Sequence, residues 1–186
     1  MGGGMLLLEW IGAGSPNEAT WDRVRRPLEA AFDMPSAYRA VDGLPAETLD
    51  TRRGQASSTK ILRWILERVP AGAEKVLGLT DADLVIPVLT FVFGEAQLGG
   101  VAAVVSTARL GARYDGGAGP PGPAGGAVHE ECPHEVGHTF GLVHCPDPVC
   151  VMARSNALPD VDRKRAGFCR GCRQRLRNRL AKRNQA

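Results

Sequence analysis

The sequence predicts an α/β fold, a mixed twisted sheet with helices packed against it. Apolar runs of strand length alternate with segments whose apolar residues recur at helical spacing. Hydrophobic residues make up 44% and charged residues 23% of the 186-residue chain, as in ordinary globular domains. The longest apolar run, residues 84–93, is broken by Pro87 and is too short to cross a bilayer. We therefore expect one globular chain, a monomer that makes no contact with a membrane.

The chain opens with a predicted strand and a predicted helix. Residues 5–11 (MLLLEWI) form a short apolar run typical of a buried strand. Ser15 is suited to cap the helix that follows, Pro16 suits its first position, and Glu18 can complete a capping box. Apolar side chains then share one face to about position 32, but Pro27 lies inside that pattern and predicts a kink or an early stop.

The middle of the chain reads as loop, helix and strands. A polar, proline-containing stretch predicts a loop to about position 50, and residues 57–69 have the apolar spacing of a second helix. Strand-like runs follow at residues 75–79, 88–93 and 101–106. Residues 116–126 (GGAGPPGPAGG) cannot hold regular structure, so we expect a flexible loop there, with Tyr114 as a loop residue beside it.

The distribution of charges and cysteines limits the possible functions of the chain. The net charge is +3, and residues 163–183 carry Lys or Arg at about every second position, with no acidic residue after Asp162. This pattern predicts a solvated basic helix, with a nucleic-acid-binding face as the alternative. The N-terminus lacks a basic region, and its apolar run stops at Glu9, so we expect a cytoplasmic protein. Five cysteines in such a chain argue against a disulfide framework, and four of them cluster after position 144, which points to metal.

The most informative segment is HEVGHTFGLVH, residues 134–144. His134 and His138 are four apart, so on a helix both imidazoles can reach one zinc ion at about 2.0–2.1 Å. Gly141 lets the chain leave the helix, and His144 then approaches from another direction. Three neutral imidazoles leave one zinc position open, which is typical of catalytic sites. A chance match is improbable because the chain has only four histidines and three are in register.

This spacing gives Glu135 a role. It lies one step round the helix from the first ligand and is not placed to bind zinc itself. Zinc lowers the pKa of a coordinated water to about 7, and a carboxylate beside it can take the proton and pass it to the leaving amine. The segment therefore predicts a zinc-dependent peptide hydrolase with Glu135 as general base.

The His-Glu-x-x-His-x-x-Gly-x-x-His string resembles that of the metzincin peptidases. The cysteines and methionine that follow it, and looser matches from about residue 50 onward, resemble the archaemetzincins in particular. The resemblance implies a metzincin-like fold, peptide substrates and an aminopeptidase-like preference. It also implies that Met152 is the Met-turn residue, an apolar floor beneath the histidines, and that residues 101–106 form one wall of the cleft. The alternative for residues 101–106 is an ordinary interior strand of the sheet.

The resemblance further implies a second, structural zinc bound by Cys145, Cys150, Cys169 and Cys172. The residues support this separately, since two cysteine pairs, one of them Cys-x-x-Cys, have the spacing of a closed four-thiolate site. Such a site stabilises a segment too polar to build its own core. We therefore expect two zinc ions per chain, an N-terminal part over residues 1–141 and a small zinc-bound helical subdomain over residues 142–186.

Three residues depart from the pattern or stay unassigned. Pro133 precedes the first ligand, so the helix should be kinked there or begin there. Cys132 is interpreted as a small buried hydrophobe, and His129 falls outside the ligand spacing.

Two other functions compete with hydrolysis. The chain could be a zinc-bearing interaction module that binds nucleic acid through its basic C-terminal helix, with affinity falling steeply with salt. Alternatively, the zinc site could have little activity because residues 116–126 block the cleft.

Overall fold

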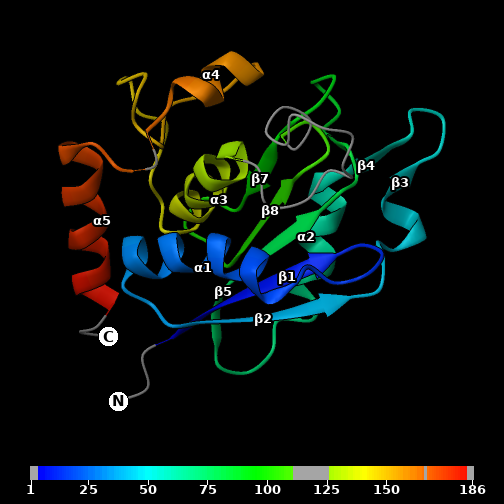
Figure 1. Ribbon diagram of the computed structural model, residues 1–186, viewed down its shortest axis with the longest axis horizontal. Helices are drawn as coiled ribbons and strands as arrows, with labels where there is room; N and C mark the ends of the chain where they lie inside the picture. Colours follow the sequence, from blue (N-terminus) through cyan, green and yellow to red (C-terminus); the bar gives the residue numbers. More distant parts are fainter. Residues whose placement is uncertain (1–3, 111–125, 166, 184–186) are drawn as a thin grey trace.

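The computed structural model describes residues 4–110, 126–165 and 167–183, which form a five-stranded sheet with helices on both faces (Figure 1). The strand order is β2-β1-β5-β8-β7, and only β7 runs antiparallel to its neighbour. The strands are β1 (Met5–Ile11), β2 (Ser36–Val41), β5 (Ala73–Thr80), β7 (Gly94–Ala96) and β8 (Ala102–Ser106). The predicted mixed α/β architecture is confirmed.

The helices enclose the sheet between two apolar clusters. Helices α1 (Glu18–Phe32) and α3 (Gly126–Thr139) pack in the larger cluster, which also holds Leu6, Leu8 and Trp10 from β1. Helix α2 (Ser58–Leu66) packs in the smaller cluster with Leu7 and Ile11 from the other face of β1. A parallel strand covered on both faces is largely apolar, which explains the hydrophobic run of β1, interrupted only by Glu9.

Helix α1 departs from its predicted start. Asn17, not Ser15, is the cap, and its side chain accepts a hydrogen bond from the backbone N–H of Thr20 at 2.9 Å. The early stop expected at Pro27 is also wrong, because the helix continues to Phe32. Buried Trp21, Val24, Leu28 and Phe32 hold that face on the core, so tertiary packing outweighs the missing N–H of Pro27.

Two segments were assigned wrongly. Residues 36–41 were expected to be loop but form β2, an edge strand beside β1 with a largely exposed surface and therefore little hydrophobic signal. The strand predicted over residues 88–93 is absent, because Val88 is 83% exposed and the segment turns between the short strand β6 (Leu84–Val85) and β7. A small second sheet forms here from β3 (Leu49–Asp50), β4 (Gln55–Ser57) and β6 (Leu84–Val85), with a short 3₁₀ turn over Ala46–Thr48 before it.

Strand β8 decides between the two readings of residues 101–106. It is buried along its whole length between β5 and β7, so it is an interior strand. The edge of the sheet beside α3 is β7, which pairs with β8 through Gly94, Glu95 and Ala96. The expectation that residues 101–106 form a wall of the cleft is corrected, because β7 covers that position.

The C-terminal part carries two helices, α4 (Leu158–Arg163) and α5 (Arg170–Arg183), beside α3 and α1 (Figure 1). Its buried residues Met152, Val161 and Leu176 join the same apolar cluster as α1 and α3. The division at residue 141 therefore stays a prediction. Within the described ranges, every helix is too short or too polar to span a membrane.

Candidate active site and metal centres

Helix α3 brings His134 and His138 to one face, with their Nε2 atoms 3.2 Å apart. Two ligands of one tetrahedral zinc lie at about this separation when each bond is about 2.0–2.1 Å. The other ring nitrogen of each histidine faces a backbone carbonyl: His134 Nδ1 donates to Val151 O at 2.8 Å and His138 Nδ1 to Leu142 O at 2.7 Å. A carbonyl only accepts, so both protons lie on Nδ1 and both Nε2 lone pairs are free for a metal.

The turn after α3 delivers the third imidazole. Gly141 has a φ of 78°, and the N–H groups of Gly141 and Leu142 donate to His138 O at 2.7 Å and Gly137 O at 3.1 Å. This pair of bonds is a Schellman ending, which needs a left-handed residue at Gly141 as the spacing predicted. The chain then returns, and the His144 ring lies 5.4 Å from His134 and 5.0 Å from His138, centre to centre. One nitrogen from each ring lies within 4.8 Å of the others, a donor set that fits zinc.

Glu135 faces a cavity of about 370 Å³ on the same side as the histidines. Burial raises the pKa of its carboxyl well above the usual range, and the charge of Glu131 raises that pKa further. Such a carboxyl holds a proton more strongly than an exposed one. Gly94 in β7 permits the approach, because a Cβ on it would lie 2.7 Å from Glu135 Cγ. The cavity is lined by residues 89–94 and by Glu131, His134, Glu135, His144, Arg154, Ser155 and Asn156.

Met152 is fully buried beneath α3. A Cβ built on Gly137 would lie 2.6 Å from Met152 Sδ, so the helix rests directly on the thioether. Met152 O also accepts from the N–H of Cys145 at 2.8 Å, which ties this turn to the residue after His144. This is where the resemblance places an apolar floor.

The contact predicts that alanine at position 137 destabilises the protein, although alanine in place of glycine usually stabilises a helix interior. Alanine favours a helix interior by about 1 kcal/mol over glycine, but overpacking a filled core costs about 1–3 kcal/mol. Gly137→Ala is therefore expected to lower the free energy of unfolding by ~1 kcal/mol, measured by urea denaturation. The matched control is Gly171→Ala in α5, where the nearest atom to the new Cβ is 4.0 Å away and stability should hold or rise. Unchanged or higher stability of Gly137→Ala would contradict the close contact.

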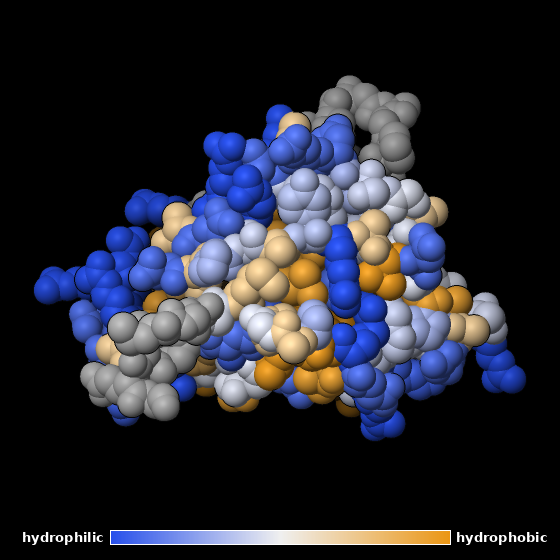
Figure 2. Space-filling view, turned by 90° about the horizontal axis from the view of Figure 1, so that it is seen from below, coloured by the Kyte–Doolittle hydropathy of each residue, from blue (hydrophilic) through white to orange (hydrophobic). Residues whose placement is uncertain are grey.

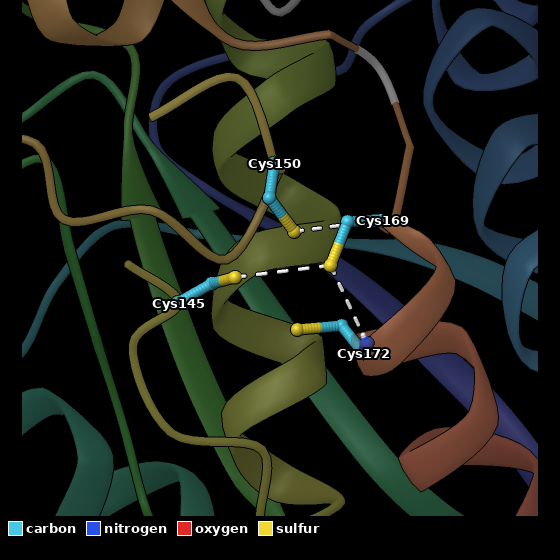
Figure 3. A group of neighbouring side chains, drawn as sticks. All are labelled: Cys145, Cys150, Cys169 and Cys172. Atoms are coloured by element: carbon cyan, nitrogen blue, oxygen red, sulfur yellow. Dashed lines mark hydrogen bonds between the residues drawn. The ribbon is translucent and has the colours of Figure 1, made fainter. Parts of the chain in front are cut away.

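The four cysteines converge from two segments, as Figure 3 shows. Cys145 and Cys150 lie on the loop after α3, whereas Cys169 and Cys172 lie at the start of α5. Cys145 Sγ is 3.8 Å from Cys169 Sγ, and all four sulfurs lie within 4.8 Å of one another. Four thiols that share one small volume fit a closed tetrahedral zinc site.

Backbone N–H groups point at two of these sulfurs. The N–H of Cys172 donates to Cys169 Sγ at 3.5 Å, and the N–H of Cys169 donates to Cys150 Sγ at 3.3 Å. The first of these bonds is the main reason that the pKa of Cys169 falls to about 7. A thiol with that pKa readily forms the thiolate that binds metal.

The structure also places the remaining residues of interest. Cys132 is 1% exposed within the core, which confirms its interpretation as a small buried hydrophobe. Helix α3 begins at Gly126, so Pro133 is internal, and of the two predicted outcomes the start of the helix at Pro133 is wrong. His129 is not part of the histidine group. Tyr114 and nearly all of residues 116–126 lie outside the described residues, so the blocked-cleft alternative stays a prediction.

Sequence reasoning missed three polar residues near the site. Glu131, Lys164 and Ser155 meet beside His134, and the side chains of the first two are 2% and 0% exposed. The position of Glu131, one helical turn before His134 and in the same register, was a usable signal. Lys164 lies 30 residues from His134, and only the packing of α4 brings it near.

Comparison with known proteins shows the family of this chain. The model of peptidase family M54 matches residues 70–178, more than half of the chain. An archaemetzincin of Methanopyrus kandleri is 44% identical over 139 residues, 74% of each chain, and one of Methanocaldococcus jannaschii is 34% identical over 168 residues, 89% of this chain and 90% of the relative.

Solved structures show the same fold. The crystal structure of the Methanopyrus kandleri archaemetzincin superposes with a TM-score of 0.78 and 35% identity, over 95% of this chain and 96% of that one. An archaemetzincin of Archaeoglobus fulgidus, complexed with malonate, gives a TM-score of 0.75 and 32% identity over 92% of this chain and 99% of its own. The chain therefore belongs to peptidase family M54, the archaemetzincins, and is a zinc metallopeptidase.

Proposed function

We propose that this chain hydrolyses peptide bonds at a catalytic zinc held by His134, His138 and His144, with Glu135 as general base. The observation that carries the proposal is the convergence of three imidazoles, two of which line one cavity together with the buried carboxylate of Glu135. When bound, zinc supplies a Lewis acid that polarises the scissile carbonyl and acidifies the attacking water.

The residues of the chain do the rest. Glu135 accepts a proton from the attacking water on a carboxylate oxygen and delivers it to the leaving amine nitrogen. The carbonyl groups of Val151 and Leu142 hold His134 and His138 in the tautomer that presents Nε2. Strand β7 offers an edge next to Glu135, where an extended peptide can add by main-chain hydrogen bonds.

We further propose a second, structural zinc on Cys145, Cys150, Cys169 and Cys172, which makes two zinc ions per chain. His138→Ala is then expected to lower the zinc content from two ions to one while the protein stays folded. Elemental analysis of the purified protein measures the content, and circular dichroism checks the fold. Loss of both ions, or retention of both, would contradict two independent sites.

An aminopeptidase-like preference is part of the proposal. Glu135 lines the cavity, and its carboxylate favours a free α-ammonium group nearby. Hydrolysis of a peptide with a free N-terminus should exceed that of its acetylated form by about tenfold or more, a difference of about 1.4 kcal/mol. Equal rates for the two peptides, compared by mass spectrometry of the products, would indicate an endopeptidase.

We also propose that the protein acts in the cytoplasm as a monomer.

The nucleic-acid alternative rests on α5. Hydrophilic side chains gather at the end of the molecule that carries this helix, on the left in Figures 1 and 2. Arg179 is in part used internally, because its guanidinium packs against Gly141. This alternative predicts binding that weakens steeply with salt and survives Glu135→Gln, whereas hydrolysis predicts loss of turnover in that variant.

A further inference from the structure

One carboxylate oxygen beside the histidine site accepts two hydrogen bonds from distant parts of the chain. Glu131 Oε1 lies 2.8 Å from Lys164 Nζ and 3.1 Å from Ser155 Oγ. The side chains of Glu131 and Lys164 are 2% and 0% exposed. The group is therefore buried, and its geometry is fixed by the fold and not by solvent.

Each partner belongs to a different part of the cleft. Glu131 is on α3, one turn before His134, and it lines the cavity. Ser155 is the middle residue of the segment 154–156, which lines the cavity together with residues 89–94. Lys164 caps the end of α4, the helix that follows this segment.

A buried ion pair is a poor device for stability, because the cost of removing both charges from water offsets their attraction. Apolar residues of similar size often stabilise as well at such positions. An apolar pair in place of Glu131 and Lys164 would lack the acceptor for the hydrogen bond that Ser155 Oγ donates to Glu131. That bond fixes the segment 154–156 relative to α3 and hence to Glu135.

We propose that Glu131 is a positioning residue for substrate binding. It holds the segment 154–156, which we call the C-terminal wall of the cleft, against α3 through Ser155. Lys164 compensates the charge of the carboxylate, so that Glu131, whose side chain is only 2% exposed, can accept the hydrogen bond from Ser155. The inference rests on the proposed function, because it assigns the cavity beside Glu135 to the peptide.

Two double variants that differ at one position test the role. Glu131→Leu with Lys164→Met removes both charges and the acceptor for Ser155. Glu131→Gln with Lys164→Met removes both charges but leaves an amide oxygen that Ser155 can bond. Both avoid the lone buried charge that would endanger folding in Lys164→Met alone. We expect similar unfolding midpoints for the two proteins.

The readout is binding, measured in a Glu135→Gln background so that nothing is cleaved. The probe is fluorescently labelled casein, an unstructured protein, followed by anisotropy. The leucine variant should bind about 10-fold more weakly than its parent, and the glutamine variant within about 3-fold of it. Zinc content should equal that of the parent in both variants. Equal binding by the two double variants, or loss of zinc from the leucine variant alone, would overturn the positioning role.

A remote buried carboxylate serves as the control. Glu9 is 1% exposed and pairs with Arg39 and Arg68 on the far part of the sheet. Glu9→Gln should lower the unfolding midpoint and leave casein binding unchanged. Weaker casein binding by Glu9→Gln would mean that binding follows the overall stability of the protein, and this would overturn the positioning role of Glu131.

The design separates this inference from the proposed function. If the protein with Glu135 intact hydrolyses neither casein nor short peptides but the binding series holds, the hydrolytic proposal fails and the positioning role stands. If casein is hydrolysed but the two double variants bind alike, the positioning role fails alone. A Glu135→Gln parent that does not bind casein would also overturn the inference, because the wall would then have no peptide to position.

Discussion

Replacing Glu135 with glutamine is expected to lower kcat/KM for peptide hydrolysis by about 10²–10⁴-fold, the usual contribution of general acid–base catalysis. Glutamine keeps the size of the side chain but cannot take a proton from water. The carboxyl is the proposed base because it is buried on the wall of the cavity that His134 and His144 also line. Cleavage of an internally quenched peptide measures the rate, and elemental analysis should show that zinc content is unchanged, since Glu135 is not one of the proposed ligands.

The matched control for this prediction is Glu130→Gln. Glu130 is on the same helix, half-buried, and does not line the cavity. Its replacement should leave the rate within about 2-fold, in line with substitutions that break no buried contact. Wild-type rates in Glu135→Gln would move the role of base to Glu131, the other described carboxylate on the cavity wall.

The histidine site was predictable because its geometry is local. Residues four apart on a helix share a face whatever the rest of the chain does, so His134 and His138 needed only a helix to meet. Gly141 was readable for a similar reason, since few residues other than glycine take the left-handed conformation that ends this helix. The buried strand β1 was equally clear, because both of its faces are covered and six of its seven residues are apolar.

The errors arose where distant parts of the chain decide the outcome. Strand β2 exists because its backbone pairs with β1, and its exposed side chains carry no matching pattern. Helix α1 passes Pro27 because four buried side chains hold it to the core, which local propensity does not record. Glu131 and Lys164 are 33 residues apart, so their pairing depends on how α4 packs against α3.

The second prediction with a large expected effect concerns the four-cysteine site. Replacing Cys169 and Cys172 together with serine is expected to remove one zinc ion per chain and to unfold the C-terminal segment. Structural zinc in small domains contributes an apparent ~10–16 kcal/mol, which exceeds or equals the whole stability of many domains, about 5–15 kcal/mol. Elemental analysis, thermal unfolding and limited proteolysis would follow the loss.

The damage should reach the histidine site, because the two sites share their connecting chain. Cys145 directly follows His144, and the turn from Cys150 to Met152 carries both a thiol and the floor beneath α3. Without the cross-link to α5, Val151 O is no longer held where His134 Nδ1 needs it. The rate of peptide hydrolysis should therefore fall when the structural zinc of the four cysteines is lost. Cys132→Ala is the control, since that thiol is buried outside the cluster and its loss should leave zinc content unchanged. A double serine variant that keeps two zinc ions and an unchanged unfolding midpoint would show that the four thiols hold no structural metal.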